Sequence, residues 1–227
     1  MKKQIFLVDA DDTILDFHAA SDNAVRAAFE SFSVPWEDRF SSVFKTLNDG
    51  LWQALERKEL TRTELIERRF PLYLKALDMQ GVDGDEFNAK YLDHLATHPL
   101  YVAGAQDFLK KLNERGRVFI VTNGTERIQR SRFTISKLYE LAQEVFVSDT
   151  IGADKPAPEY TRYVLNHIEG FEKEKAVWIG DSLSADIKAA NEAGIDSIWY
   201  NPSKKPLKEG ITPTHTVSSF EEIWQFL

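Results

Sequence analysis

Short apolar segments recur along the chain, and each ends on a small or polar residue. They are IFLVD at 5–9, VFIVTN at 118–123, EVFVSD at 144–149 and AVWIGD at 176–181, with SIWY at 197–200 as a fifth. Segments that are apolar throughout, rather than alternating with polar residues, are typical of strands buried on both faces of a parallel sheet. The pattern therefore predicts a buried parallel sheet.

Helical patterns lie between these segments. They are AQDFLKKLNERG at 105–116, with Gly116 as the expected C-terminal cap, TERIQRSRFTISKL at 125–138, PEYTRYVLNHI at 158–168, and LSADIKAANEAG at 183–194, ending at Gly194. Strands that alternate with helices at this spacing indicate an α/β fold, with a doubly wound, Rossmann-like parallel sheet as its core.

One interval breaks the alternation. Residues 16–98 contain no convincing strand but four helical patterns, which are AASDNAVRAAFESF, FSSVFKTLNDGLWQAL, TRTELIERRFPLYLKAL and DEFNAKYLDHLA. We therefore predict a core domain formed by residues 1–15 and 99–227 and an inserted helical domain at 16–98. Most aromatic side chains of the insert fall at helical spacing and are expected to form its core.

Composition and charge narrow the possible functions. The 227 residues include 28 Lys and Arg against 36 Asp and Glu, so the formal net charge is −8, and this argues against a partner that is a nucleic-acid polymer or an anionic membrane. The absence of cysteine excludes disulfides and thiolate nucleophiles. No apolar run has the length of a signal peptide core or a membrane span. We expect a cytoplasmic protein, either a monomer or a weak homo-oligomer.

Polar residues gather where the predicted strands end. Asp9 and Asp11 follow the first strand, Thr122 and Asn123 close the second, and Asp181 follows the fourth. A single carboxylate in such a loop usually caps a helix or shapes a turn. Several polar residues at neighbouring strand ends of a parallel sheet indicate a binding site instead, because ligands bind at this edge of such sheets.

The motifs that contain these residues resemble those of a known family. DADDT at 9–13, TNG at 122–124, Lys155 within GADKPAPEY, and GDSLSAD at 180–186 occur in the order seen in the haloacid dehalogenase-like (HAD) superfamily of phosphohydrolases, in its subfamily with a helical cap inserted after the first motif. Ala10, the segment AGIDSIWYNPSKKP and the later HTVSSFEEI resemble the group of pyrimidine and noncanonical-nucleotide 5′-nucleotidases. The resemblance implies a Mg²⁺-dependent phosphatase that acts on a small phosphorylated metabolite, namely a nucleotide.

The resemblance also implies a role for each motif residue. Asp9 is the expected nucleophile, which forms an aspartyl-phosphate, and Asp11 is expected to protonate the leaving group and then to activate water. Mg²⁺ is expected to bind the Asp9 carboxylate, the Asp11 backbone carbonyl and Asp181. Asp12 is expected to shape the loop instead of taking part in the reaction.

The remaining motif residues are expected to bind phosphate or to support the site. Thr122 and Asn123 would hold phosphate oxygens through the hydroxyl and the backbone amides at the start of the next helix, and Gly124 would let the backbone approach the phosphate closely. Lys155 would supply positive charge to the phosphoryl group. Asp186 would hold a metal-bound water or orient Lys155.

Other functions share parts of this pattern. A sugar-phosphate phosphatase or a phosphomutase of the same fold would carry every core motif, and its differences would lie in the inserted domain. A phosphoacceptor signalling domain also combines strand-end acids with a Thr and a Lys, although the insert and the chain length argue against it. Dehalogenation, which the same fold performs, is disfavoured by Asp11, because the dehalogenases lack that second acid.

Overall fold

The computed structural model describes residues 2–227 and divides into two compact units. The chain up to Asp16 forms the first unit together with Leu100–Leu227, and Phe17–Pro99 forms the second. Asp16 thus lies in the first unit and Pro99 in the second. Each unit has its own buried core and is described separately below.

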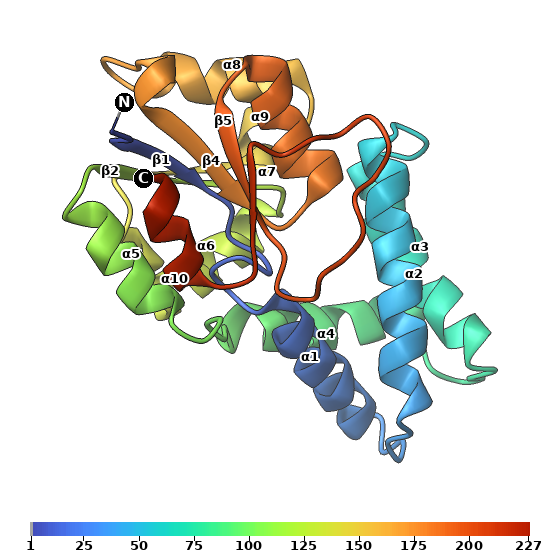
Figure 1. Ribbon diagram of the computed structural model, residues 1–227. Coiled ribbons are helices and arrows are strands. Elements are labelled where there is room, and N and C mark those ends of the chain that lie inside the picture. The colour runs from blue at the N-terminus through green and yellow to red at the C-terminus, as the bar shows by residue number, and fades with distance from the viewer. Residues whose placement is uncertain (1) are drawn as a thin grey trace. The chain divides into compact units, whose positions relative to one another are not determined.

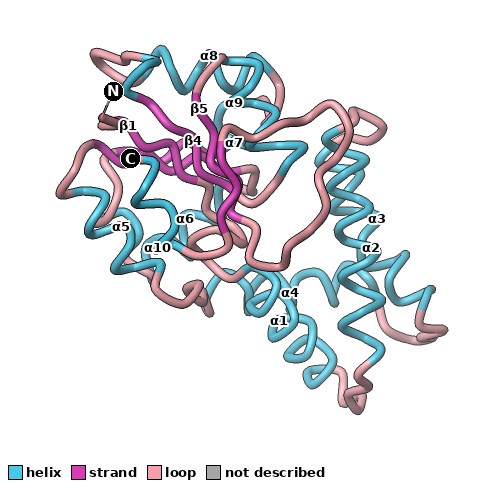
Figure 2. The backbone as a smooth tube through the Cα atoms, in the orientation of Figure 1, coloured by secondary structure: helices cyan, strands magenta, loops and turns pink. Residues whose placement is uncertain are grey.

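The first unit is built on a six-stranded sheet in the order β3-β2-β1-β4-β5-β6, in which every neighbouring pair is parallel. Figure 2 shows the strands in magenta, with helices on either side of them. The strands are β1 (Ile5–Val8), β2 (Arg117–Thr122), β3 (Glu144–Val147), β4 (Ala176–Gly180), β5 (Asp196–Tyr200) and β6 (His215–Val217). The predicted α/β fold class is confirmed. The edge strand β6 was not predicted, because its three residues carry too little apolar pattern to stand out.

Helices cover both faces of the sheet (Figure 1). On one face lie α5 (Ala105–Asn113), α6 (Glu126–Ile135) and α10 (Phe220–Ile223), and on the other lie α8 (Pro158–His167) and α9 (Lys188–Ala193). Alternate residues of one strand serve the two faces: Phe6 packs with the first set of helices and Leu7 with the second, and neither is exposed. Burial on both faces explains why the strand segments are apolar throughout.

Short helical turns lie between these elements or, for the last of them, at the end of the chain. They are η1 (Leu138–Glu140), α7 (Ser148–Ile151), η2 (Lys173–Lys175), the π-helical turn η3 (Leu183–Ile187) and η4 (Trp224–Phe226). The helix predicted at 125–138 is therefore shorter than expected, since α6 ends at Ile135 and Lys137 adopts a left-handed conformation with φ 59°. The helix predicted at 183–194 begins as the π-helical turn and ends, as expected, before Gly194, whose φ is 65°.

Gly116 does not have the expected role of a helix cap. Helix α5 ends at Asn113, and Glu114 follows in a right-handed conformation. A Cβ atom on Gly116 would lie only 2.2 Å from the carbonyl oxygen of Gln4. The glycine is therefore required where β2 begins beside β1, a close approach of two backbones that a helix-ending pattern cannot reveal.

The second unit contains four helices, and no strand occurs within Phe17–Pro99. The helices are α1 (Phe17–Ser31), α2 (Arg39–Glu56), α3 (Arg62–Ala76) and α4 (Gly84–Thr97), and α1 packs mainly against α4. Its core is aromatic: the ring of Phe29 lies 4.6 Å from that of Phe40 and 4.7 Å from that of Phe87. Thr61 begins α3 through a reciprocal capping box with Glu64.

Candidate active site

The strand order reverses between β1 and β4 at the centre of the sheet. From β1 the chain continues outward through β2 and β3, and it then returns to β4 on the other side of β1. The loops that leave two such strands separate, and a crevice forms outside their carboxyl ends. Asp9 follows β1 and Asp181 follows β4, so both acids lie at the reversal point.

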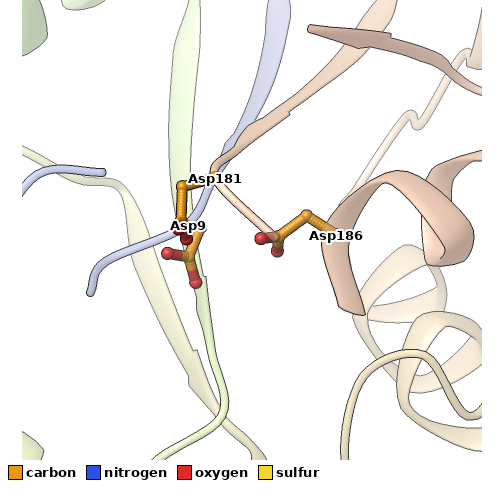
Figure 3. Close-up of side chains that lie close together, drawn as sticks. All are labelled: Asp9, Asp181 and Asp186. Carbon is orange, nitrogen blue, oxygen red and sulfur yellow. The ribbon is translucent and has the colours of Figure 1, made fainter. Parts of the chain in front are cut away.

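Asp9, Asp181 and Asp186 form a cluster of carboxylates at this point (Figure 3). One oxygen atom from each lies within 4.8 Å of those from the other two. Asp9 and Asp186 are only 5% and 1% exposed. Gly180 makes room for this arrangement, because a Cβ atom there would lie 2.3 Å from the Cγ atom of Asp186. The glycine of the GDSLSAD motif is thus a packing requirement of the acid that follows it.

Lys155 bridges two of these acids. Its ammonium group donates to Asp9 Oδ1 at 2.5 Å, to Asp186 Oδ1 at 2.7 Å and to the carbonyl oxygen of Val121 at 2.8 Å, and the residue is 1% exposed. An ammonium group has three protons, and each has an acceptor here. When ionised, the three carboxylates and this ammonium carry a net charge of −2, which one divalent cation would neutralise.

Burial and mutual repulsion change the acidity of this cluster. Burial raises the pKa of Asp9 well above its ordinary value, the Asp186 and Asp181 carboxylates add to this effect, and Lys155 opposes it. Burial also raises the pKa of Asp181 to about 7, with further contributions from Asp12 and Asp186. Burial disfavours the charged form of Lys155, but the Asp186 and Asp9 carboxylates outweigh it and raise the pKa of that ammonium.

Asn123 holds the loop that carries Lys155. Its side-chain amide donates to the carbonyl oxygen of Lys155 at 2.8 Å, and its side-chain oxygen accepts from the Lys155 backbone N–H at 2.8 Å. The second motif is thus tied directly to the third across 32 positions of sequence. Phosphate binding by Thr122, Asn123 and Gly124 remains a prediction.

The side chain of Asp11 is held by helix α6. Arg132 Nη1 lies 2.7 Å from Asp11 Oδ1, and Gln129 Nε2 donates to Asp11 Oδ2 at 2.8 Å and to the hydroxyl of Thr122 at 2.9 Å. Neither α6 residue was among the predicted site residues. Gln129 and Arg132 are three positions apart, so they lie on the same face of the helix as the apolar residues of TERIQRSRF, and this spacing could have indicated that they are buried. The same segment contains exposed arginines, however, so the sequence alone does not distinguish Arg132 from them.

Asp12 shapes the first loop. Its backbone is in the left-handed region with φ 59°, and its N–H donates to the carbonyl oxygen of Leu15 at 2.7 Å. This agrees with the role expected for it. Its charge nevertheless contributes to the raised pKa of Asp181, an influence on the acid cluster that strand alternation did not suggest.

Comparison with known proteins identifies the family. The model of the haloacid dehalogenase-like hydrolases matches residues 6–200, which covers most of the chain and all four motifs. The chain belongs to the haloacid dehalogenase-like hydrolases. It is therefore a hydrolytic enzyme, as the motifs predicted.

Three relatives of this HAD-like hydrolase carry informative names. The HAD-hydrolase YfnB of Bacillus subtilis is 38% identical over 97% of this chain and 94% of its own length. The pyrimidine 5′-nucleotidase PynA of Streptococcus pneumoniae is 34% identical over 97% and 93%, and the pyrimidine 5′-nucleotidase YjjG of Escherichia coli is 26% identical over 100% and 99%. These matches confirm the resemblance drawn from the sequence.

A solved structure agrees with the fold along the whole chain. The crystal structure of YfnB bound to magnesium superposes on this HAD-like hydrolase with a TM-score of 0.94 and 37% identity, over 100% of this chain and 99% of the other. Among residues 2–227, no helix has the length and apolar character needed to cross a membrane.

Proposed function

We propose that this HAD-like hydrolase cleaves small phosphomonoesters through an aspartyl-phosphate on Asp9, with pyrimidine nucleoside 5′-monophosphates as preferred substrates. The observation that carries the reaction is the group formed by the buried residues Asp9, Lys155 and Asp186 with the partly buried Asp181 at the reversal point of the sheet. Burying charge is costly, so the burial of Asp9, Lys155 and Asp186 beside one another favours a catalytic role for these groups over a stabilising one.

The two acids of the first loop have complementary parts in this proposal. A carboxylate oxygen of Asp9 attacks phosphorus, and the bond between phosphorus and the leaving alkoxide oxygen breaks as Asp11 gives that oxygen a proton. Water then attacks the phosphorus of the aspartyl-phosphate, Asp11 takes the proton of that water, and inorganic phosphate leaves as the Asp9 carboxylate is restored. Proton transfer of this kind contributes about 10²–10⁴ in rate.

The acid cluster has the character of a Mg²⁺ site. Its carboxylate oxygens are the hard ligands that Mg²⁺ prefers, and their net charge with Lys155 suits one divalent cation. We propose that Asp9 and Asp181 hold the ion with the backbone carbonyl of Asp11, and that Asp186 supports the site by orienting Lys155. The bound ion would neutralise the phosphate charge that otherwise repels Asp9. The magnesium present in the YfnB crystal structure supports the same ion here.

The phosphate would lie against the second motif and Lys155. Thr122 contributes its hydroxyl, and Asn123 and Gly124 contribute backbone N–H groups at the approach to α6, where such groups favour anions. The ammonium of Lys155 compensates the charge that develops on the phosphoryl oxygens during transfer. The contacts between the Asn123 side chain and Lys155 fix these two parts of the phosphate site to each other.

The preference for nucleotides comes from the relatives. PynA and YjjG are named pyrimidine 5′-nucleotidases, and both match along nearly their whole length, including the helical unit. Two other relatives are named phosphoserine phosphatase and glyceraldehyde 3-phosphate phosphatase, and they are 28% and 26% identical to this chain. Other small phosphate esters are therefore the alternative substrate class.

A panel of phosphomonoesters tests both parts of the proposal. With Mg²⁺ present, we expect phosphate release to be fastest from pyrimidine nucleoside 5′-monophosphates, and Asp9→Asn to abolish it for every ester. A clear preference for a hexose phosphate would refute the nucleotidase assignment but leave the phosphatase intact. Full activity of the Asp9→Asn variant would refute the mechanism itself.

A further inference from the structure

The buried face of α6 carries two polar side chains among apolar ones. Ile128 and Phe133 are the apolar residues of this face. Gln129 and Arg132 are polar, but they are as buried as their apolar neighbours, at 2% and 1% exposed. Residues three positions apart lie next to each other on a helix. Gln129 and Arg132 accordingly form one polar pair within an otherwise apolar contact, and Arg132 Nη1 donates to Gln129 Oε1 at 2.7 Å.

This pair engages both oxygens of the Asp11 carboxylate. Arg132 Nη1 lies 2.7 Å from Oδ1, and Gln129 Nε2 donates to Oδ2 at 2.8 Å. The Asp11 side chain is 24% exposed, and its Oδ1 atom is buried and accepts no hydrogen bond from residues 2–227, although the Arg132 guanidinium lies beside it. A carboxylate offers about four lone-pair directions, and those unused by α6 can exchange a proton with a ligand.

Stability does not account for the arrangement. Burying the guanidinium of Arg132 costs about as much as an ion pair returns, so a well-packed apolar side chain at this position would serve the fold equally well. The chain also makes room for Gln129 in a specific way: a Cβ atom on Gly124 would lie 2.6 Å from Gln129 Cγ. The glycine of the second motif is thus matched to the side chain that reaches Asp11.

We infer that Gln129 and Arg132 are positioning residues that hold the Asp11 carboxylate in the orientation needed to deliver a proton to the leaving group. The inference rests on the phosphatase function proposed above and deepens it. A free aspartate side chain rotates among several rotamers, and a misplacement of about 1 Å in a reacting group can cost on the order of 10²-fold in rate. Gln129 also bonds the hydroxyl of Thr122, so the same helix sets Asp11 relative to the phosphate site.

Two substrates with different leaving groups test this role. A nucleoside 5′-monophosphate releases a strongly basic alkoxide that needs a proton, whereas p-nitrophenyl phosphate releases a stable phenolate that does not. The quantity to compare is kcat/KM, because it reports the steps up to transfer of phosphate to Asp9 and excludes the later hydrolysis. If the panel prefers another alkyl phosphate, that ester replaces the nucleotide.

For Arg132→Met we expect kcat/KM to fall by about 30- to 100-fold for the nucleotide and by less than about 3-fold for p-nitrophenyl phosphate. Arg132→Lys keeps a cation near Asp11 and should recover part of the nucleotide activity. The matched control is Arg130→Met on the exposed side of the same helix, where Arg130 lies 3.8 Å from Glu126, and it should leave both values unchanged.

Equal losses with both substrates would show that Arg132 only supports the fold, and no loss with either would show that Asp11 does not depend on it; both results would overturn the inference. If Arg132→Met does not fold, Gln129→Leu allows the same comparison, with an expected difference of about 5- to 10-fold between the substrates. Failure of the phosphatase proposal would look different, because the unaltered enzyme would then hydrolyse neither ester.

Discussion

The raised pKa of Asp181 makes a quantitative prediction about metal binding and pH. Burial, with the charges of Asp12 and Asp186, raises this pKa to about 7, and a proton on the carboxylate competes with Mg²⁺. For a single competing proton with that pKa, the group is about 90% protonated at pH 6 and about 10% protonated at pH 8. The apparent Kd for Mg²⁺ should therefore be about tenfold weaker at pH 6 than at pH 8, which is roughly 1.4 kcal/mol of binding free energy.

The same shift determines how stability changes with pH. Since the folded pKa of Asp181 lies above the ordinary value of 3.8, folding without metal takes up a proton between about pH 4 and pH 7. Asp181 therefore favours the fold most below about pH 4, and this contribution is lost as the pH rises to about 7. Asp9, whose pKa burial also raises, acts in the same direction. Mg²⁺ should restore stability increasingly as the pH rises through this range.

Isothermal titration calorimetry in buffers of different ionisation enthalpy measures both the affinity and the protons released. We expect about 0.9 proton per Mg²⁺ from Asp181 at pH 6 and about 0.1 at pH 8. Lys205 lies 3.4 Å from Asp181 Oδ2 and lowers the pKa of that carboxyl, so Lys205→Met should move the pH midpoint upward. A Kd at pH 6 within about twofold of that at pH 8 would refute the reasoning.

Three further substitutions test individual contacts. Lys155→Met leaves the Asp9 and Asp186 carboxylates buried without their cation. Denaturant titration at pH 7 without metal should show that the free energy of unfolding falls by about 3–5 kcal/mol. An unchanged midpoint would mean that the two acids are not both ionised at this pH. Gly180→Ala places a Cβ atom against Asp186 and should lower the free energy of unfolding by about 1–3 kcal/mol. We also expect kcat to fall more than about tenfold, because Asp186 is displaced. An unchanged kcat would show that Asp186 can move freely. Thr61→Ala removes the cap of α3 and should cost about 1 kcal/mol in thermal unfolding with kcat preserved, and a change in kcat would contradict its purely structural role.

Local pattern was sufficient for the elements that bury residues on both sides. The apolar segments ending at Val8, Val147 and Gly180 became strands because each fills two layers of core, and this requirement is visible in the order of residues. The short strand His215–Val217 and the role of Gly116 were not visible. Both depend on a neighbouring backbone, which pairs with the strand and approaches the glycine closely.

The sequence by itself determined the α/β class, the four motifs and their order, because strands, turns and reactive side chains are properties of short segments. Only the tertiary structure decided how those segments act on one another. It placed Lys155 against Asp9 and Asp186, tied Asn123 to the Lys155 backbone, and brought Arg132 to Asp11 across 121 positions of chain. Such pairs leave no mark in local periodicity, because a buried polar residue on a helix is distinguished from an exposed one only by what packs over it.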